Sequence, residues 1–165
     1  MLIHVLIDFL LAFCVAYCWG ILFGTPRQGL WMAGLLGGFG HCLRFIQLQF
    51  GGGLIASTLI SSMAIGLLGI FCSHKVHNPP VVFTMPACIT MIPGLYAYRS
   101  MLGTIKLSDM SILQQDPNVL QEIAHNVVLT FSLLFTLAVG ISISVLLFRN
   151  RSVKESHIYK WFAKN

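Results

Sequence analysis

The sequence predicts an all-α integral membrane protein, a bundle of about five transmembrane helices. Of its 165 residues, 56% are hydrophobic and only 9% are charged, with a mean hydropathy of +0.82. A soluble domain of this size does not bury so much apolar surface, whereas a bilayer covers the outward faces of a helical bundle. The hydrophobic residues also gather in five runs, each long enough to cross about 30 Å of hydrocarbon.

These five runs define the expected helices, because a helix satisfies every backbone polar group within the spanning segment. The expected spans are residues 2–24, 30–48, 54–72, 81–101 and 124–148, which together form a membrane domain over 1–148. The first run has no Lys or Arg before its apolar stretch and contains Asp8, so we interpret it as a permanent helix and not as a signal peptide. Residues 149–165 form a basic tail that we expect in the cytoplasm.

The second run carries Gly34, Gly37, His41 and Arg44 on one helical stripe. Its small residues let a neighbouring helix approach closely. A stripe ending in an imidazole and a guanidinium is not expected to face lipid, since a charge near the midplane costs roughly 2.5 to 3.5 kcal/mol. Two alternatives stay open for each polar residue. Arg44 either snorkels to the outer headgroups or contacts a substrate or anion, and His41 is either a packing residue or a proton carrier or ligand contact.

Small and polar residues in the third and fifth runs predict helix-on-helix packing. In the third run they are Ser57, Ser61, Ser62, Gly66, Gly69 and Ser73. In the fifth run they are Asn126, Thr130, Thr136, Gly140 and Ser144.

The fourth run is expected to be a helix broken by prolines. Pro86 and Pro93 each remove an internal hydrogen bond and crowd the carbonyl four residues earlier, and Gly94 lowers the cost of leaving helical geometry. Their seven-residue spacing puts both prolines on nearly the same face. Freed carbonyls must find partners in protein or in a water-lined cavity. Transporters use such discontinuous helices at substrate sites, while a purely structural kink is the alternative.

The candidates for a substrate pathway lie at this break and on the second run. They are His41, Arg44, Thr84, Pro86, Thr90, Pro93, Gly94, Tyr98 and Arg99. Tyr96, Tyr98 and Arg99 equally resemble an interfacial anchor, the interpretation we prefer for Tyr96. Asp8 is expected at the outer interface.

The sequence argues against an enzyme and predicts no cofactor or metal. It contains no Ser-His-Asp, Cys-His or paired-carboxylate arrangement at membrane depth. Its five cysteines lie in or beside apolar segments, which predicts free thiols. His74 and His77 lack nearby carboxylates or thiolates that would complete a zinc site. No basic motif with interleaved aromatics suggests a nucleic-acid partner.

Charge distribution predicts the orientation of the chain. Five crossings put the termini on opposite sides of the membrane, and a cytoplasmic C-terminus gives seven Lys and Arg inside against three outside. We therefore expect the N-terminus outside. The inside set is Arg27, Lys75, Arg149, Arg151, Lys154, Lys160 and Lys164, and the outside set is Arg44, Arg99 and Lys106.

Two segments of the chain carry distinctive motifs, LLGGFGHCLRF at 35–45 and NPPVVFTMPACITMIPGLYAYRSMLGTIKLS at 78–108. Their most specific positions are Gly40-His41 with Arg44, Val82-Phe83-Thr84, Met91, Pro93-Gly94, Ala97-Tyr98, and Lys106 with Ser108. Together these motifs resemble the threonine/serine exporter family, and within it the short, separately encoded YjjB-like branch. The likeness extends over almost the whole chain from Arg27 onward.

This resemblance implies a non-enzymatic, multi-pass subunit of the bacterial inner membrane that works with a larger YjjP-like membrane subunit. For the short branch it implies a small carboxylate substrate, succinate, with threonine or serine as the alternative. Arg44, His41 and the broken fourth helix would contribute to a site shared with the partner. A structural or assembly role without its own substrate site stays open, as does a higher oligomer.

Overall fold

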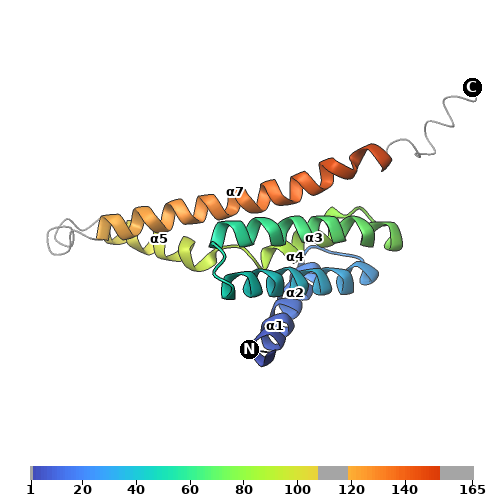
Figure 1. Cartoon of the computed structure of the whole chain (residues 1–165), viewed down its shortest axis with the longest axis horizontal. Coiled ribbons are helices and arrows are strands. Elements are labelled where there is room, and N and C mark those ends of the chain that lie inside the picture. Colours follow the sequence, from blue (N-terminus) through green and yellow to red (C-terminus); the bar gives the residue numbers. More distant parts are fainter. Residues whose placement is uncertain (1, 108–118, 153–165) are drawn as a thin grey trace, which may run out of the picture.

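The computed structural model describes residues 2–107 and 119–152, and every regular element in these two stretches is an α-helix (Figure 1). The helices are α1 (Leu2–Leu22), α2 (Arg27–Gln49), α3 (Leu54–Val76), α4 (Val81–Ile89), α5 (Gly94–Leu107) and α7 (Val119–Ser152). The basic tail expected at 149–165 lies largely outside the described residues.

Three of these helices are long and apolar enough to cross a membrane, namely α1, α3 and α7. A fourth span is added if α4 and α5 count together, since they pass the same test as a pair with a 57° bend. α2 is not among these candidate spans, because its glycines and its polar residues, which include Arg44 and Gln47, lower its mean hydropathy. An all-helical, membrane-type architecture is thus confirmed, while the count of five crossings stays a prediction.

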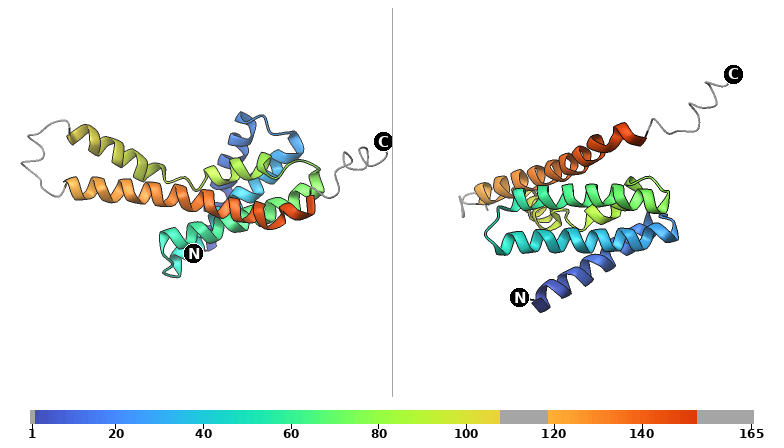
Figure 2. Two further views of the ribbon diagram at one scale, coloured as in Figure 1. Left: turned by 90° about the horizontal axis from the view of Figure 1, so that it is seen from above. Right: turned by 45° about the vertical axis from the view of Figure 1, so that its right-hand side comes forward.

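Four helices form a row, and α4 packs against one side of it. Successive members of the row, α1, α2, α3 and α7, pack against one another, and α4 packs on α1, α2 and α3 (Figures 1 and 2). α5 leaves this bundle and lies beside the first part of α7 (Figure 2). The bend between α4 and α5 therefore falls next to α2, the helix at the centre of the bundle.

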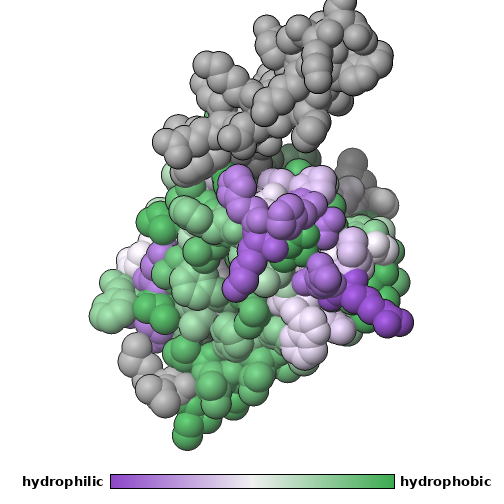
Figure 3. Space-filling view, turned by 90° about the vertical axis from the view of Figure 1, so that its right-hand side faces the viewer, coloured by the Kyte–Doolittle hydropathy of each residue, from purple (hydrophilic) through white to green (hydrophobic). Residues whose placement is uncertain are grey.

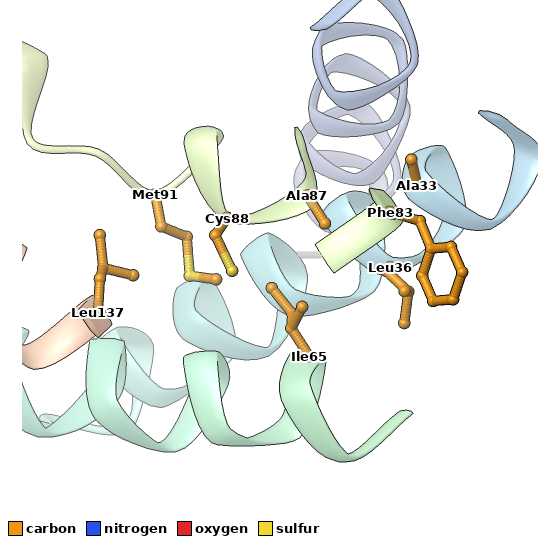
Figure 4. Close-up of a cluster of buried hydrophobic side chains, with 8 residues drawn as sticks. All are labelled: Ala33, Leu36, Ile65, Phe83, Ala87, Cys88, Met91 and Leu137. Atoms are coloured by element: carbon orange, nitrogen blue, oxygen red, sulfur yellow. The ribbon is translucent and has the colours of Figure 1, made fainter. Parts of the chain in front are cut away.

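A buried apolar cluster joins α4 to the row (Figure 4). Its members are Ala33, Leu36, Ile65, Phe83, Ala87, Cys88, Met91 and Leu137. Outward-facing apolar side chains surround it, among them Phe131 and Phe135 of α7, which are 70% and 72% exposed. Because a lipid environment covers such side chains without penalty, the small inner cluster and apolar exterior suit a bilayer.

The glycine stripe of α2 brings its neighbours unusually close, as predicted. A Cβ added to Gly37 would overlap the Cβ of Ala16 on α1, and one added to Gly40 would overlap Ile65 on α3. At Gly34 the same atom would lie 2.7 Å from the ring of Phe13. Side chains at these positions would force the three helices apart.

The expected packing of small residues between α3 and α7 is also confirmed. A Cβ on Gly66 would lie 2.5 Å from the Cβ of Ser144, and one on Gly140 would overlap the Ser62 hydroxyl. Ser144 Oγ donates a 3.0 Å hydrogen bond across the interface to the Met63 carbonyl. Close approach and this hydrogen bond hold α7 on α3.

The fourth hydrophobic run is interrupted once, at residues 90–93, and not at both prolines. Pro93 ends the interruption, whereas α4 continues through Pro86, so the expected break at Pro86 is wrong. The reason is local compensation. Pro86 leaves the carbonyl of Val82 without its helical partner, and the hydroxyl of Thr25 donates a 3.1 Å hydrogen bond to it instead.

Exposed polar side chains gather at the end of the bundle where α2 begins and α3 ends (Figure 3). Arg27 belongs to the first turn of α2, and His74 and Lys75 belong to the last turn of α3. All three side chains are exposed. This end differs from the apolar flanks and is suited to a membrane–water interface.

Candidate functional site

Arg44 reaches from α2 to the interrupted segment between α4 and α5. Its Nη1 donates a 3.2 Å hydrogen bond to the carbonyl oxygen of Met91. Met91 lies outside both helices and its side chain is fully buried in the apolar cluster, which holds this carbonyl in place. The break thus directs a free main-chain acceptor at a guanidinium, as expected for a carbonyl released from a helix.

Four buried side-chain atoms lack a hydrogen-bond partner within the described part of the chain, and all come from α2 and α3. They are Arg44 Nε, Gln47 Oε1, Ser57 Oγ and Ser61 Oγ. α2 and α3 are antiparallel neighbours, and Gly40 of α2 faces Ile65 of α3. One turn further along α2, Arg44 therefore lies near the level of Ser61, and Gln47 lies near the level of Ser57. We call this group the polar seam.

The polar seam opens into a small cavity beside the turn that joins α2 to α3. Its volume is about 250 Å³, and it is lined by Gln47, Phe50, Gly52, Ala56, Ser57 and Ile60. A space of this size holds several water molecules, each occupying about 30 Å³ in the liquid. Unpaired Gln47 and Ser57 face it, so water or a small polar ligand can satisfy them there.

Asp8 and His41 join α1 to α2 through a second polar contact. The Oδ2 atom of Asp8 lies 2.8 Å from Nδ1 of His41. Asp8 was expected at the outer interface, but the structure pairs it with a residue 33 positions away. Arg44 follows His41 by three positions and so lies on the same face of α2. Asp8, His41 and Arg44 thus form a line of ionisable side chains that leads toward the break.

The other predicted pathway residues lie apart from this line. Thr84 is buried and packs its methyl group against Gly69, and the hydroxyl of Thr90 donates a 2.8 Å hydrogen bond to the Ala87 carbonyl at the end of α4. Tyr98 and Arg99 are exposed on α5.

The proline and glycine positions also differ from one another. Pro86 is buried within α4, and Pro93 is buried at the end of the break. Gly94 is exposed, and a Cβ added to it would meet open space, so packing does not require a glycine there. The structure therefore brings Arg44 to Met91 in the break that ends at Pro93, and it pairs His41, one turn earlier on α2, with Asp8. Thr90 begins this break and Gly94 directly follows it, while Thr84, Pro86, Tyr98 and Arg99 lie outside it.

A larger groove between α4 and α7 has a different character. It has a volume of about 570 Å³, and its walls are apolar side chains with Thr84 and Ser142 as the polar exceptions. None of the described residues that line it is charged. A carboxylate would lose its hydration in this groove without a compensating partner, so the groove is not suited to an ionic substrate.

Sequence reasoning missed Asp8 as a partner of His41 and assigned Ser57 and Ser61 to packing alone. It also omitted Gln47, although a signal was present. Gln47 follows Arg44 by three positions and so continues the stripe that contains His41. Within the described residues, no group of three or more His, Cys, Asp or Glu could hold a metal ion.

A helical membrane protein with an interrupted helix and a line of ionisable side chains inside its bundle has the architecture that transporters use. The family model for Threonine/Serine exporter, ThrE, matches residues 8–147. The chain belongs to the threonine/serine exporter family, and it is therefore a component of a transporter. No solved structure matches it.

Proposed function

We propose that this chain is the membrane subunit of a two-component secondary exporter of small carboxylates, with succinate as its substrate. Its partner is a larger YjjP-like subunit of the bacterial inner membrane. The observation that carries the proposal is the contact between the Arg44 guanidinium and the Met91 carbonyl at the helix break. A cation held beside freed backbone groups within the bundle is suited to binding an anion.

Arg44 is suited to this role because a guanidinium binds a carboxylate with two parallel hydrogen bonds. Its Nη1 is held by one neutral carbonyl, and its buried Nε has no partner among the described residues. An incoming carboxylate would form a stronger, charge-assisted bond than the carbonyl does. The hydroxyls of Ser57 and Ser61 supply two further donors on the same seam.

The unsatisfied polar seam also supports the need for a partner subunit. Lipid offers no hydrogen bonds, so buried polar groups facing a membrane must be satisfied by protein, water or substrate. Gln47 and Ser57 open onto a cavity at the edge of this chain, where an adjacent subunit can close the site. A larger membrane subunit would thus complete a pathway that this chain leaves half formed.

The proposed orientation places the N-terminus outside and the C-terminus in the cytoplasm. The polar end with Arg27, His74 and Lys75 then faces inward, following the positive-inside rule. The turn between α2 and α3 faces outward, so the polar seam leads from the break toward the external side. This direction is the one an exporter needs for its exit route.

Threonine or serine is the second candidate substrate, favoured by the family and by one atom of the seam. Gln47 Oε1 is a buried acceptor without a donor within the described residues. The ammonium group of an amino acid would supply that donor, whereas an ionised dicarboxylate has none. Arg44 would bind the carboxylate in either case.

Export of succinate, threonine and serine should be measured in cells that lack their endogenous exporters. The chain is expressed alone and together with the larger subunit, and the membrane abundance of both is quantified. We expect succinate efflux only from the pair. Efflux by this chain alone would contradict the need for a partner, and efflux of threonine or serine without succinate would favour the second candidate.

The variants Arg44→Ala and Pro93→Ala then test the site. Arg27→Ala is the matched control for Arg44→Ala, because Arg27 is exposed at the opposite end of α2. Pro79→Ala is the matched control for Pro93→Ala, because Pro79 is exposed ahead of α4. We expect loss of efflux at normal abundance for the first two variants only. Unchanged efflux would remove Arg44 and Pro93 from the mechanism, and lower partner abundance alone would favour an assembly role.

A further inference from the structure

Asp8 and His41 form the one ion pair between described residues, and they lie well inside their helices. Their side chains are only 22% and 30% exposed. Asp8 follows Leu2 by six residues, about 9 Å along α1, and His41 precedes the end of α2 at Gln49 by eight residues, about 12 Å. Neither charge therefore lies at a helix end, where headgroups and water would solvate it.

The chemistry of the pair allows it to take up one proton. Histidine is the side chain that ordinarily changes charge between pH 5 and 8. Asp8 accepts the hydrogen bond from Nδ1–H of His41, and this bond is compatible with both the neutral and the charged imidazole. Nε2 has no partner within the described ranges, so the exchangeable proton binds there. Protonation changes the net charge of the pair from −1 to zero.

We propose that the Asp8–His41 pair is the proton-binding site of the exporter and that its protonation strengthens carboxylate binding at Arg44. The proposal rests on the proposed function, since it assumes an anionic group of the substrate at that residue. Proton and carboxylate then bind together, and the exporter is a co-transporter of the two.

The direction of the effect follows from electrostatics. His41 and Arg44 lie one turn apart on α2, and Asp8 lies 2.8 Å from His41, so the charges of both groups contribute to the potential at Arg44. With neutral His41, the carboxylate of Asp8 offsets the positive potential at Arg44 and repels a second carboxylate. With protonated His41, Asp8 is neutralised locally and the charge of Arg44 is left for the substrate.

Other titratable groups near the pair do not supply the same response. On the helices of the pair, His4 lies one turn before Asp8 and Cys42 follows His41, and α4, which packs on both helices, carries Cys88. Among these residue types only histidine ordinarily titrates between pH 5 and 8. His4 is exposed, and the variant His4→Gln serves as a control for it.

The experiment uses proteoliposomes that contain this chain and its larger partner, with labelled succinate as the probe. Succinate–succinate exchange at equal pH reports carboxylate binding, and accumulation under an imposed pH gradient at clamped voltage reports proton coupling. The wild-type complex should accumulate succinate from an acidic exterior. Its apparent affinity should rise on acidification by at most about tenfold per pH unit, the limit for one linked proton.

Two variants should shift affinity in opposite directions. Asp8→Asn removes the opposing charge and should give tight, pH-independent exchange. His41→Gln leaves Asp8 charged and should give weak, pH-independent exchange. Both should lose accumulation driven by the pH gradient, and the double exchange Asp8→His with His41→Asp should restore it. A merely structural pair would lower abundance in both variants and move neither pH profile.

His4→Gln, His74→Gln and Glu122→Gln are controls that should behave as wild type, since all three side chains are exposed. Gradient-driven accumulation by either pair variant would overturn the proposal, as would proton movement opposite to succinate in the wild type. Loss of exchange together with abundance in both variants, without rescue by the double exchange, would also overturn it. If the wild-type complex showed no succinate exchange at all, the proposed substrate would be wrong, and this result is distinguishable from a failure of proton coupling alone.

Discussion

The hydroxyl of Thr25 donates a 3.1 Å hydrogen bond to the carbonyl of Val82, which Pro86 leaves without its usual partner in α4. Thr25 lies between α1 and α2 and is 8% exposed, so this bond ties the first helical hairpin to α4. One side chain therefore explains why α4 continues through a proline.

The variant Thr25→Val tests this relationship. It keeps the shape of the side chain but leaves the Val82 carbonyl unsatisfied, so we expect a loss of about 1 to 3 kcal/mol in the free energy of unfolding. The thermal unfolding midpoint in detergent measures the change. Combination with Pro86→Ala should reduce the loss, because the alanine N–H can bond Val82 again. Thr104→Val is the control, since that exposed hydroxyl bonds only within α5.

Packing between α1 and α2 should depend on Gly37. In the variant Gly37→Ala the new methyl group would overlap Ala16, and we expect destabilisation of roughly 1 to 3 kcal/mol by overpacking. Gly94→Ala is the matched comparison, because its new methyl group meets open space and is expected to be neutral or to stabilise by up to about 1 kcal/mol. Equal unfolding midpoints for the two variants would contradict the close α1–α2 contact.

The polar seam should be accessible to water from the external side. In a chain without its native cysteines, Ser57→Cys should react with a membrane-impermeant thiol reagent added outside, and excess succinate should slow the reaction. Leu68→Cys on the same helix is the control, since its side chain is directed outward among apolar neighbours and should stay unreactive in lipid. An unreactive Ser57→Cys at normal abundance would place the seam away from the aqueous path.

Orientation can be tested at the two ends of α2. Gln28→Cys should react only from the cytoplasmic side, and Phe50→Cys only from outside, because the positive-inside rule directs Arg27 and Lys75 inward. Both positions are exposed, and Phe50 is 80% exposed. Labelling of both cysteines from one side would mean that α2 does not cross the membrane. Reversed labelling would invert the whole arrangement.

The hydrophobic runs of the sequence were sufficient to predict where most helices lie, and the family resemblance agrees with the family match. Expected spans at 2–24 and 54–72 correspond to α1 and α3, although α3 continues to Val76. The fourth run was predicted to break, and it does so beside Pro93. Such features depend on local chemistry: apolar length, helix propensity and the missing N–H of proline.

Contacts between distant residues were decided only by the tertiary structure. Asp8 meets His41, Thr25 compensates for Pro86, and the buried hydroxyls of Ser57 and Ser61 have no hydrogen-bond partner among the described residues. Each outcome depends on how far one helix is rotated and shifted along another. Close contacts such as Gly37 against Ala16 set that rotation and shift, because interlocking side chains accept few arrangements. The pattern of a single sequence does not specify which of these arrangements is adopted.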